Sequence, residues 1–235
     1  MSPQEQLGTI AHAIKYTAGR CKIIAGTGSN NTAHCLEMSR VADSMGAGAL
    51  LLVTPYYNKC TQAGLVRHYT TVADTVRCPV IVYNVPSRTG VDIPVEVYRR
   101  LSQIPNIAGV KEASSDIRKL ARIRSQCPDH FTVWCGNDDL AVAAMALGAK
   151  GLISVVSNIE PEITGSMIGA ALDGDFDTAT ALQLSLLPLI EALFQEVNPI
   201  PVKAAMAIIG YDCGSCRMPL CSPSEETSAL LKDLL

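Results

Sequence analysis

The stretch Pro79-Val80-Ile81-Val82-Tyr83-Asn84-Val85 is apolar and β-branched along most of its length and becomes polar only near its end. A strand that is apolar on both faces is typical of a parallel sheet covered by helices. Five further runs have the same character, and we expect each to form a strand. They lie at residues 21–27, 49–54, 107–111, 132–136 and 151–155.

Helical patterns separate these runs, and strands that alternate with helices predict a parallel sheet with right-handed crossovers. The expected helices lie at 31–45, 62–76, 94–103, 115–125, 138–147 and 161–172. After residue 173 the strand pattern stops, and helical patterns follow at 176–195, 199–209 and 223–235. The last of these has Ser222 as its expected N-cap, with Pro223 at the first helical position and Glu225 completing a capping box.

The chain also opens on a helical pattern, which Ser2 and Glu5 introduce as a capping box and which extends to about Tyr16. A (β/α)8 TIM barrel closes with eight strands. We therefore predict an α/β fold in which residues 1–173 form a TIM barrel that lacks its first strand-helix-strand segment. Residues 174–235 are expected to form a C-terminal helical appendage.

A doubly wound open sheet is the alternative architecture for six parallel strands. That fold usually carries a G-x-G-x-x-G turn that binds a dinucleotide. Residues 26–31 match only the first half of this pattern, because the last position is Asn31. The sequence therefore favours the barrel over a nucleotide-binding sheet.

The composition narrows the classes of function. The chain has 235 residues, 48% of them hydrophobic and 17% charged, and its net charge is −3. It has no basic run, no apolar segment long enough to cross a bilayer and no signal-peptide pattern. We expect a cytoplasmic protein that binds small molecules, with neither a nucleic acid nor a membrane as its partner.

The nine cysteines are an odd number in a chain without an export signal, so we interpret them as reduced thiols. Cys21, Cys35 and Cys135 fall in predicted strands or helices. Cys213 and Cys216 form a C-x-x-C with Cys221 nearby, but a fourth ligand at zinc spacing is missing. We predict no metal site.

Lys111 is the most informative single residue, because it ends an apolar strand where a lysine has little structural use. Sites in parallel α/β folds collect at the carboxyl ends of strands. Burial would lower the pKa of this amine from about 10.4 and free it as a nucleophile. The alternative is an ion pair with Glu112, but strand alternation places residues 111 and 112 on opposite faces.

Two neighbouring positions complete a candidate site. Tyr83 ends the adjacent strand, where a phenol can relay protons, although it could also be an aromatic residue at the edge of the core. Arg88 follows in a turn between Pro86 and Gly90. Its guanidinium suits a substrate carboxylate, and its alternative is a solvated loop arginine.

These residues belong to a series of six strings that extends along nearly the whole chain. In order, the strings are Ala25-Gly26-Thr27-Gly28, Thr54-Pro55-Tyr56-Tyr57-Asn58, Tyr83-Asn84-Val85-Pro86-Ser87-Arg88-Thr89-Gly90, Val110-Lys111-Glu112-Ala113, Gly151-Leu152-Ile153-Ser154-Val155 and Asn198-Pro199-Ile200-Pro201-Val202-Lys203. Together they resemble the dihydrodipicolinate synthase family of the N-acetylneuraminate lyase superfamily. The lysine string is shared across that superfamily, whereas the Arg88 string marks the synthase branch.

The resemblance implies a class I lyase of lysine and diaminopimelate biosynthesis. Lys111 is expected to form an imine with pyruvate, whose enamine attacks aspartate semialdehyde to give hydroxytetrahydrodipicolinate after cyclisation. Tyr83 would relay protons, and Tyr57 would reach across a dimer interface. Arg88 would bind the semialdehyde carboxylate, and backbone groups near Gly136 and Ile153 would line the pyruvate pocket. The resemblance implies a homo-oligomer, commonly a tetramer built from tight dimers, without a metal or an organic cofactor.

The family pattern begins with a strand, a helix and a second strand that ends in a Gly-Thr-Thr-Gly-Glu loop, whereas this sequence begins on a helix. We therefore expect an N-terminally shortened member of the family. The resemblance also places a lysine-binding regulatory site at Asn30, Tyr56 and His34. Because His34 stands where inhibited members have an acidic residue, we expect weak or absent feedback inhibition.

Two alternatives from the sequence remain. The first is another pyruvate-dependent aldolase, such as a sialic-acid or sugar-acid lyase, and Arg88 argues against it. The second is a non-catalytic truncated family member that acts as the structural or regulatory partner of a longer subunit.

Overall fold

The computed structural model describes residues 1–235, which divide into two compact units, Met1–Trp134 and Cys135–Leu235. Each unit has its own helices and its own buried residues. The predicted boundary between a barrel at 1–173 and an appendage at 174–235 stays a prediction.

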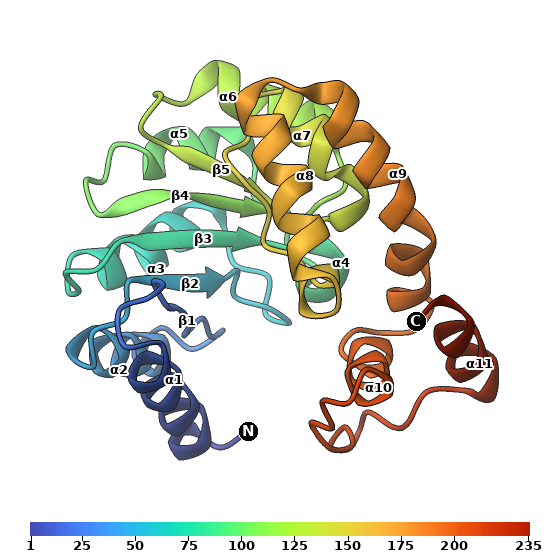
Figure 1. Ribbon diagram of the computed structural model, residues 1–235. Helices are drawn as coiled ribbons and strands as arrows, with labels where there is room; N and C mark the ends of the chain where they lie inside the picture. The colour runs from blue at the N-terminus through green and yellow to red at the C-terminus, as the bar shows by residue number, and fades with distance from the viewer. The chain divides into compact units, whose positions relative to one another are not determined.

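The first unit is built on a parallel sheet whose strands follow one another in chain order (Figure 1). Tyr83 pairs with Lys111 across the third and fourth strands, and Asn84 pairs with Glu112. The strands are β1 (Ile24–Gly26), β2 (Ala49–Val53), β3 (Val80–Asn84), β4 (Ile107–Glu112) and β5 (Thr132–Cys135). Five of the six expected strands therefore form, as parallel neighbours in the expected order.

A helix follows each of the first four strands. These helices are α2 (Thr32–Ser44), α3 (Gln62–Ala73), α5 (Val95–Leu101) and α6 (Ile117–Gln126), and a single turn, α4 (Pro86–Thr89), precedes α5. The chain begins with α1 (Pro3–Thr17), where the Glu5 amide donates to Ser2 Oγ and the Ser2 amide donates to the Glu5 carboxylate. The predicted capping box at the start of the chain is confirmed.

The sixth expected strand, at 151–155, is reduced to a single β-bridge between Cys135 and Leu152. The Cys135 amide donates to the Gly151 carbonyl, and the Ile153 amide donates to the Cys135 carbonyl. Two residues later the Val155 amide donates to Asp138 Oδ2 instead of to a neighbouring strand. The ladder therefore ends there, and the chain continues into the 3-10 turn η2 (Val156–Asn158).

The second unit is mainly helical. It contains η1 (Asp138–Leu140), α7 (Ala141–Ala146), α8 (Pro161–Asp173), α9 (Phe176–Leu193), α10 (Ile200–Ile208) and α11 (Glu225–Leu234). The expected cap of the last helix was wrong, because Ser224 rather than Ser222 accepts the Thr227 amide. Thr227 occupies the position at which a capping box needs a carboxylate, and Glu196 supplies one instead by accepting the Ser224 amide at 2.8 Å.

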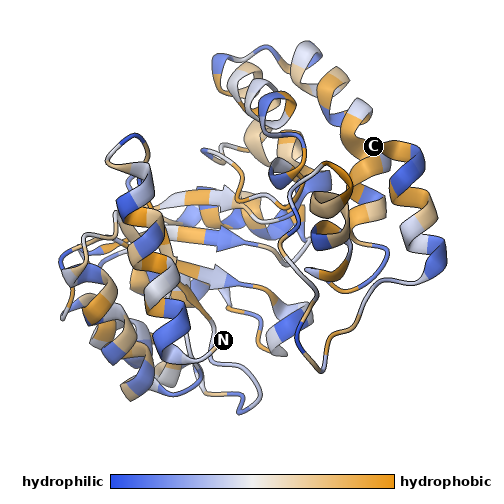
Figure 2. Ribbon diagram, turned by 60° about the horizontal axis from the view of Figure 1, so that its bottom comes forward, coloured by the Kyte–Doolittle hydropathy of each residue, from blue (hydrophilic) through white to orange (hydrophobic).

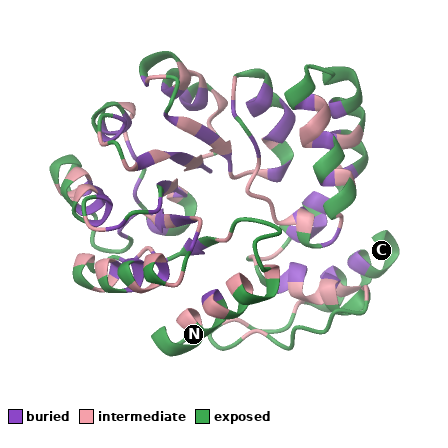
Figure 3. Ribbon diagram, turned by 60° about the vertical axis from the view of Figure 1, so that its left-hand side comes forward, coloured by how far each residue is buried: buried purple, intermediate pink, exposed green.

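Apolar burial holds the first unit together. Hydrophobic residues run along the strands (Figure 2), and the helices carry buried and exposed residues on different sides (Figure 3). Leu50, Val80 and Val110 are fully buried in the strands. Each such side chain contributes about 1.5–3 kcal/mol when it is removed from water.

The cysteines divide between core and surface. Cys35 and Cys135 are buried, as expected of core residues. Cys21 is exposed, because β1 begins only at Ile24 and the residues before it lie outside the sheet. None of the helices has the length and apolar character needed to span a membrane.

At Gly109 the backbone of β4 closely approaches the backbone of β5. The φ of this glycine is +156°, and a Cβ built on it would lie 1.9 Å from the Thr132 carbonyl oxygen of β5. No side chain fits this space, because the obstacle is backbone rather than a movable side chain.

We predict that Gly109→Ala lowers the free energy of unfolding by about 4 kcal/mol or more, through this backbone clash. Urea unfolding followed by circular dichroism measures the change. Gly165→Ala is the matched control, since a Cβ at this position in α8 meets nothing within 4 Å, and its effect should stay below about 1 kcal/mol. Equal midpoints for Gly109→Ala and the unsubstituted chain would contradict the prediction.

Candidate active site

Lys111 and Tyr83 lie side by side at the carboxyl ends of β4 and β3. The parallel register pairs the two residues directly, and Lys111 Nζ lies 4.2 Å from the centre of the Tyr83 ring. Both side chains are half-buried. Because the two side chains end adjacent strands, the amine and the phenol can both face a small molecule that occupies these strand ends.

The surroundings of Tyr83 control its protonation state. Burial raises the pKa of the phenol above its usual value of about 10, and the nearby positive charge of Arg88 partly offsets this rise. The phenol therefore carries its proton at neutral pH and can donate it.

Arg88 projects from the short turn α4, which follows β3 directly. Gly90 ends the turn with φ +69°, a left-handed conformation that glycine adopts without strain. Thr89 Oγ1 accepts the Val91 amide at 3.2 Å and so braces the turn. Arg88 itself is exposed, which leaves its guanidinium within reach of a bound anion.

Tyr57 lies in the loop after β2 and is 86% exposed, with φ at +69°. This backbone conformation is uncommon for a non-glycine residue. The loop is joined to the start of α2, because Asn30 Nδ2 donates to the Tyr56 carbonyl at 3.3 Å. His34 stands in the first turn of that helix. Asn30 and Tyr56 of the expected regulatory site are therefore in direct contact.

Gly136 and Ile153 belong to the second unit. The Ile153 amide donates to the Cys135 carbonyl at 2.9 Å, so the backbone at 153 lies against the peptide that leads into Gly136. The two expected pocket residues are thus neighbours, although they are 17 positions apart in the chain.

A buried polar cluster behind the strand ends was not predicted. Asn84 and Glu112 each follow a candidate site residue by one position, and both are almost fully buried. Glu112 accepts hydrogen bonds from Asn84 and Tyr98. A signal was present in the sequence, since a polar residue at the end of each of two apolar strands requires a partner when it is buried.

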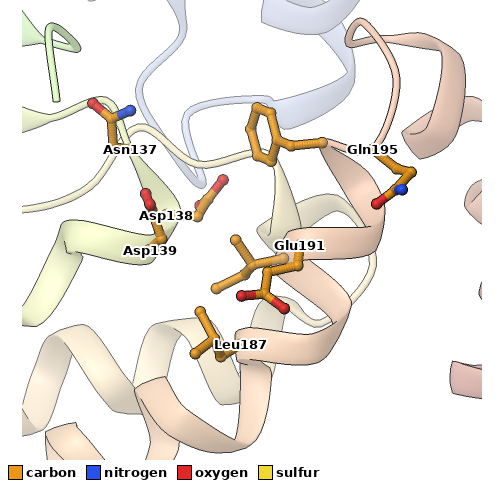
Figure 4. A pocket seen from close by; sticks show the side chains of 8 residues that line it. Asn137, Asp138, Asp139, Leu187, Glu191 and Gln195 are labelled. Carbon is orange, nitrogen blue, oxygen red and sulfur yellow. The ribbon is translucent and has the colours of Figure 1, made fainter.

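A separate cavity of about 510 Å³ lies within the second unit, between η1 and α9 (Figure 4). The polar residues around it are largely acidic or amide side chains, while Leu187, Ile190 and Phe194 add apolar surface. The polar residues are Asn137, Asp138, Asp139, Glu191 and Gln195. Across the chain, no three His, Cys, Asp or Glu side chains are grouped so as to hold a metal ion.

The model of the dihydrodipicolinate synthetase family matches residues 1–235. This chain belongs to that family. It is 46% identical over 235 residues to the 4-hydroxy-tetrahydrodipicolinate synthase of Acetivibrio thermocellus, with 100% of the chain and 80% of the relative covered. It is 51% identical over 223 residues to the synthase of Exiguobacterium sibiricum, with 95% and 76% covered.

Solved structures show the same fold. The chloride-inhibited dihydrodipicolinate synthase from Acinetobacter baumannii, complexed with pyruvate, superimposes with a TM-score of 0.97 at 39% identity. The match covers 100% of this chain and 80% of that one. The expected TIM-barrel class with C-terminal helices is confirmed, and family membership makes the chain a class I lyase.

Gln183 of α9 supports the wall of the second-unit cavity. Its Nε2 donates to the Asp138 carbonyl at 2.9 Å, and its Oε1 accepts the Val142 amide at 3.3 Å. Gln183 is only 8% exposed, so water cannot readily replace these bonds.

We predict that Gln183→Leu lowers the free energy of unfolding by about 1–3 kcal/mol, because it leaves buried backbone groups without their partner. Chemical denaturation measures the change. Gln195→Leu serves as the control, since this glutamine lines the same cavity but is exposed, and it should change stability by less than about 0.5 kcal/mol. Equal losses in the two variants would refute the prediction.

Proposed function

We propose that the chain condenses pyruvate with aspartate semialdehyde through an imine on Lys111, which gives hydroxytetrahydrodipicolinate for lysine and diaminopimelate biosynthesis. The observation that supports this most directly is the lysine amine 4.2 Å from the centre of the Tyr83 ring, at the ends of two parallel strands. Membership of the family supplies the reaction class.

The first step uses both side chains. The free amine of Lys111 adds to the C2 carbonyl of pyruvate, and Tyr83 donates a proton to the departing oxygen, which leaves as water. The resulting iminium draws electrons from the pyruvate methyl group, and loss of a proton gives the enamine. Because the imine itself accepts these electrons, the reaction requires no organic cofactor and no metal.

The second step forms a carbon-carbon bond. The enamine carbon attacks the aldehyde carbon of the semialdehyde, and the aldehyde oxygen takes a proton to become a hydroxyl group. The amine of the semialdehyde then attacks the imine carbon, closes the ring and releases Lys111. In this scheme Arg88 pairs with the semialdehyde carboxylate.

The remaining roles are those that membership of the family implies. Tyr57 is 86% exposed, so its ring is available to a second copy of the chain, and we place it across a dimer interface where it completes the neighbour's proton relay. The same family implication assigns backbone groups near Gly136 and Ile153 a role in binding pyruvate. The working state is a homo-oligomer, either a dimer or a tetramer built from two dimers, in the cytoplasm.

We predict that incubation with pyruvate followed by borohydride adds one reduced pyruvate to Lys111, because borohydride traps only the imine. Peptide mass spectrometry locates the adduct. Lys111→Arg should give none, whereas Lys203→Arg should react like the unsubstituted chain. Aspartate semialdehyde added before the reductant should lower the yield, and N-acetylmannosamine, the aldehyde partner of a sialic-acid lyase, should not. A folded sample without the Lys111 adduct would refute the proposal.

The proposed regulatory site leads to a prediction about feedback. His34 offers no negative charge to the amino groups of lysine, so lysine at millimolar concentration should leave imine formation almost unchanged. His34→Glu should introduce measurable lysine binding in calorimetry. Ala33→Glu controls for a new charge in the same helical turn. Strong inhibition of the unsubstituted chain would show that the role given to His34 is wrong.

A further inference from the structure

Five side chains form a polar cluster on the far side of β3 and β4 from Lys111 and Tyr83. Neighbouring residues on a strand point to opposite faces, so Asn84 and Glu112 turn away from the side that Tyr83 and Lys111 occupy. We call this group the Asn84 cluster. Its members are Asn84, Asp92, Tyr98, Glu112 and Lys119.

Contacts within the Asn84 cluster tie the two strand ends together. Asn84 Nδ2 lies 2.9 Å from Glu112 Oε1 and 3.2 Å from Oε2. The Tyr98 hydroxyl donates to Glu112 Oε2 at 2.8 Å, and the Ser114 amide donates to Oε1 at 2.9 Å. Asn84 is 0% exposed and Glu112 is 4% exposed. The contact between the strand ends is therefore shielded from water.

The same asparagine also closes the loop that carries Arg88. Asn84 Oδ1 accepts the Ile93 amide at 3.1 Å, and Nδ2 donates to Asp92 Oδ1 at 2.9 Å. Lys119 of α6 forms an ion pair with Asp92. One side chain therefore links the two ends of the segment in which Arg88 lies.

We propose that Asn84 is a positioning residue that aligns Tyr83, Arg88 and Lys111 for imine chemistry. Asn84 follows Tyr83 directly in the chain and hydrogen-bonds to Glu112, the residue after Lys111. It also hydrogen-bonds to Asp92 and Ile93, at the end of the loop that contains Arg88. The inference rests on the proposed function, because it concerns how the same site is held. A misplacement of a reacting group by about 1 Å can slow a reaction about 100-fold. Loss of the Asn84 hydrogen bonds should therefore slow the chemical step.

Asn106 provides a matched control for a purely structural effect. Its Nδ2 also donates three hydrogen bonds, to the carbonyls of Ala73, Val76 and Cys78 at 3.1, 2.8 and 3.2 Å. It directly precedes β4, and its own carbonyl accepts the Val80 amide at the beginning of β3. It therefore braces the opposite ends of the same two strands.

The test compares Asn84→Ala with Asn106→Ala. Each protein is mixed with pyruvate for set times, quenched with borohydride and analysed for the Lys111 adduct per folded molecule. Asn84→Ala should lower the limiting rate of adduct formation by about tenfold or more, while the half-saturating pyruvate concentration changes by less than about twofold. Asn106→Ala should keep the rate within about twofold although it also loses stability.

Tyr98→Phe is a milder variant that removes only the hydroxyl donor to Glu112 and keeps the packed ring. It should lower the limiting rate by a smaller factor, and it keeps the test open if Asn84→Ala does not fold. An unchanged rate in Tyr98→Phe and in folded Asn84→Ala would overturn the inference. An equal slowing in Asn106→Ala would overturn it too, because general destabilisation would then explain the effect. If the unsubstituted chain forms no adduct, the proposed function itself fails. If it forms the adduct and the variants form it at the same rate, only the role given to Asn84 fails.

Discussion

The parallel register of β3 against β4 sets the geometry of both faces of the sheet at this point. Main-chain pairing places Tyr83 opposite Lys111 and Asn84 opposite Glu112. Because side chains alternate along a strand, a slip by one residue would exchange the two faces and separate both pairs. The reactive pair and the supporting pair therefore depend on the same set of backbone hydrogen bonds.

The two faces place different demands on their residues. Tyr83 and Lys111 are half-buried, which lets a small molecule reach them and still raises the pKa of the Tyr83 phenol. The face behind them excludes water, so its polar groups need partners inside the protein. The carboxylate of Glu112 accepts three donors there, from Asn84, Tyr98 and Ser114. A polar layer with its bonds satisfied is rigid and holds the more accessible face in place.

In the second unit, hydrogen bonds to Asp138 likewise fix the backbone. Asp138 accepts the Val155 amide through its side chain and the Gln183 side chain through its carbonyl. These bonds end the short bridge at Leu152 and attach α9 to the turn before α7. Asp138, which lines the cavity of this unit, thus also fixes the backbone conformation around it.

The sequence alone determined the strand-helix alternation, the positions of Tyr83 and Lys111 at strand ends and that of Arg88 in the turn after a strand, because apolar runs and turn residues are local signals. The family followed from strings that span nearly the whole chain. Local patterns could not decide where Ser224 caps the last helix or how the segment at 151–155 ends, since Glu196 and Asp138 supply the deciding bonds from distant positions. Only the tertiary structure revealed the Asn84 cluster, because its partners lie as far as 28 residues apart and meet only when the strands pair.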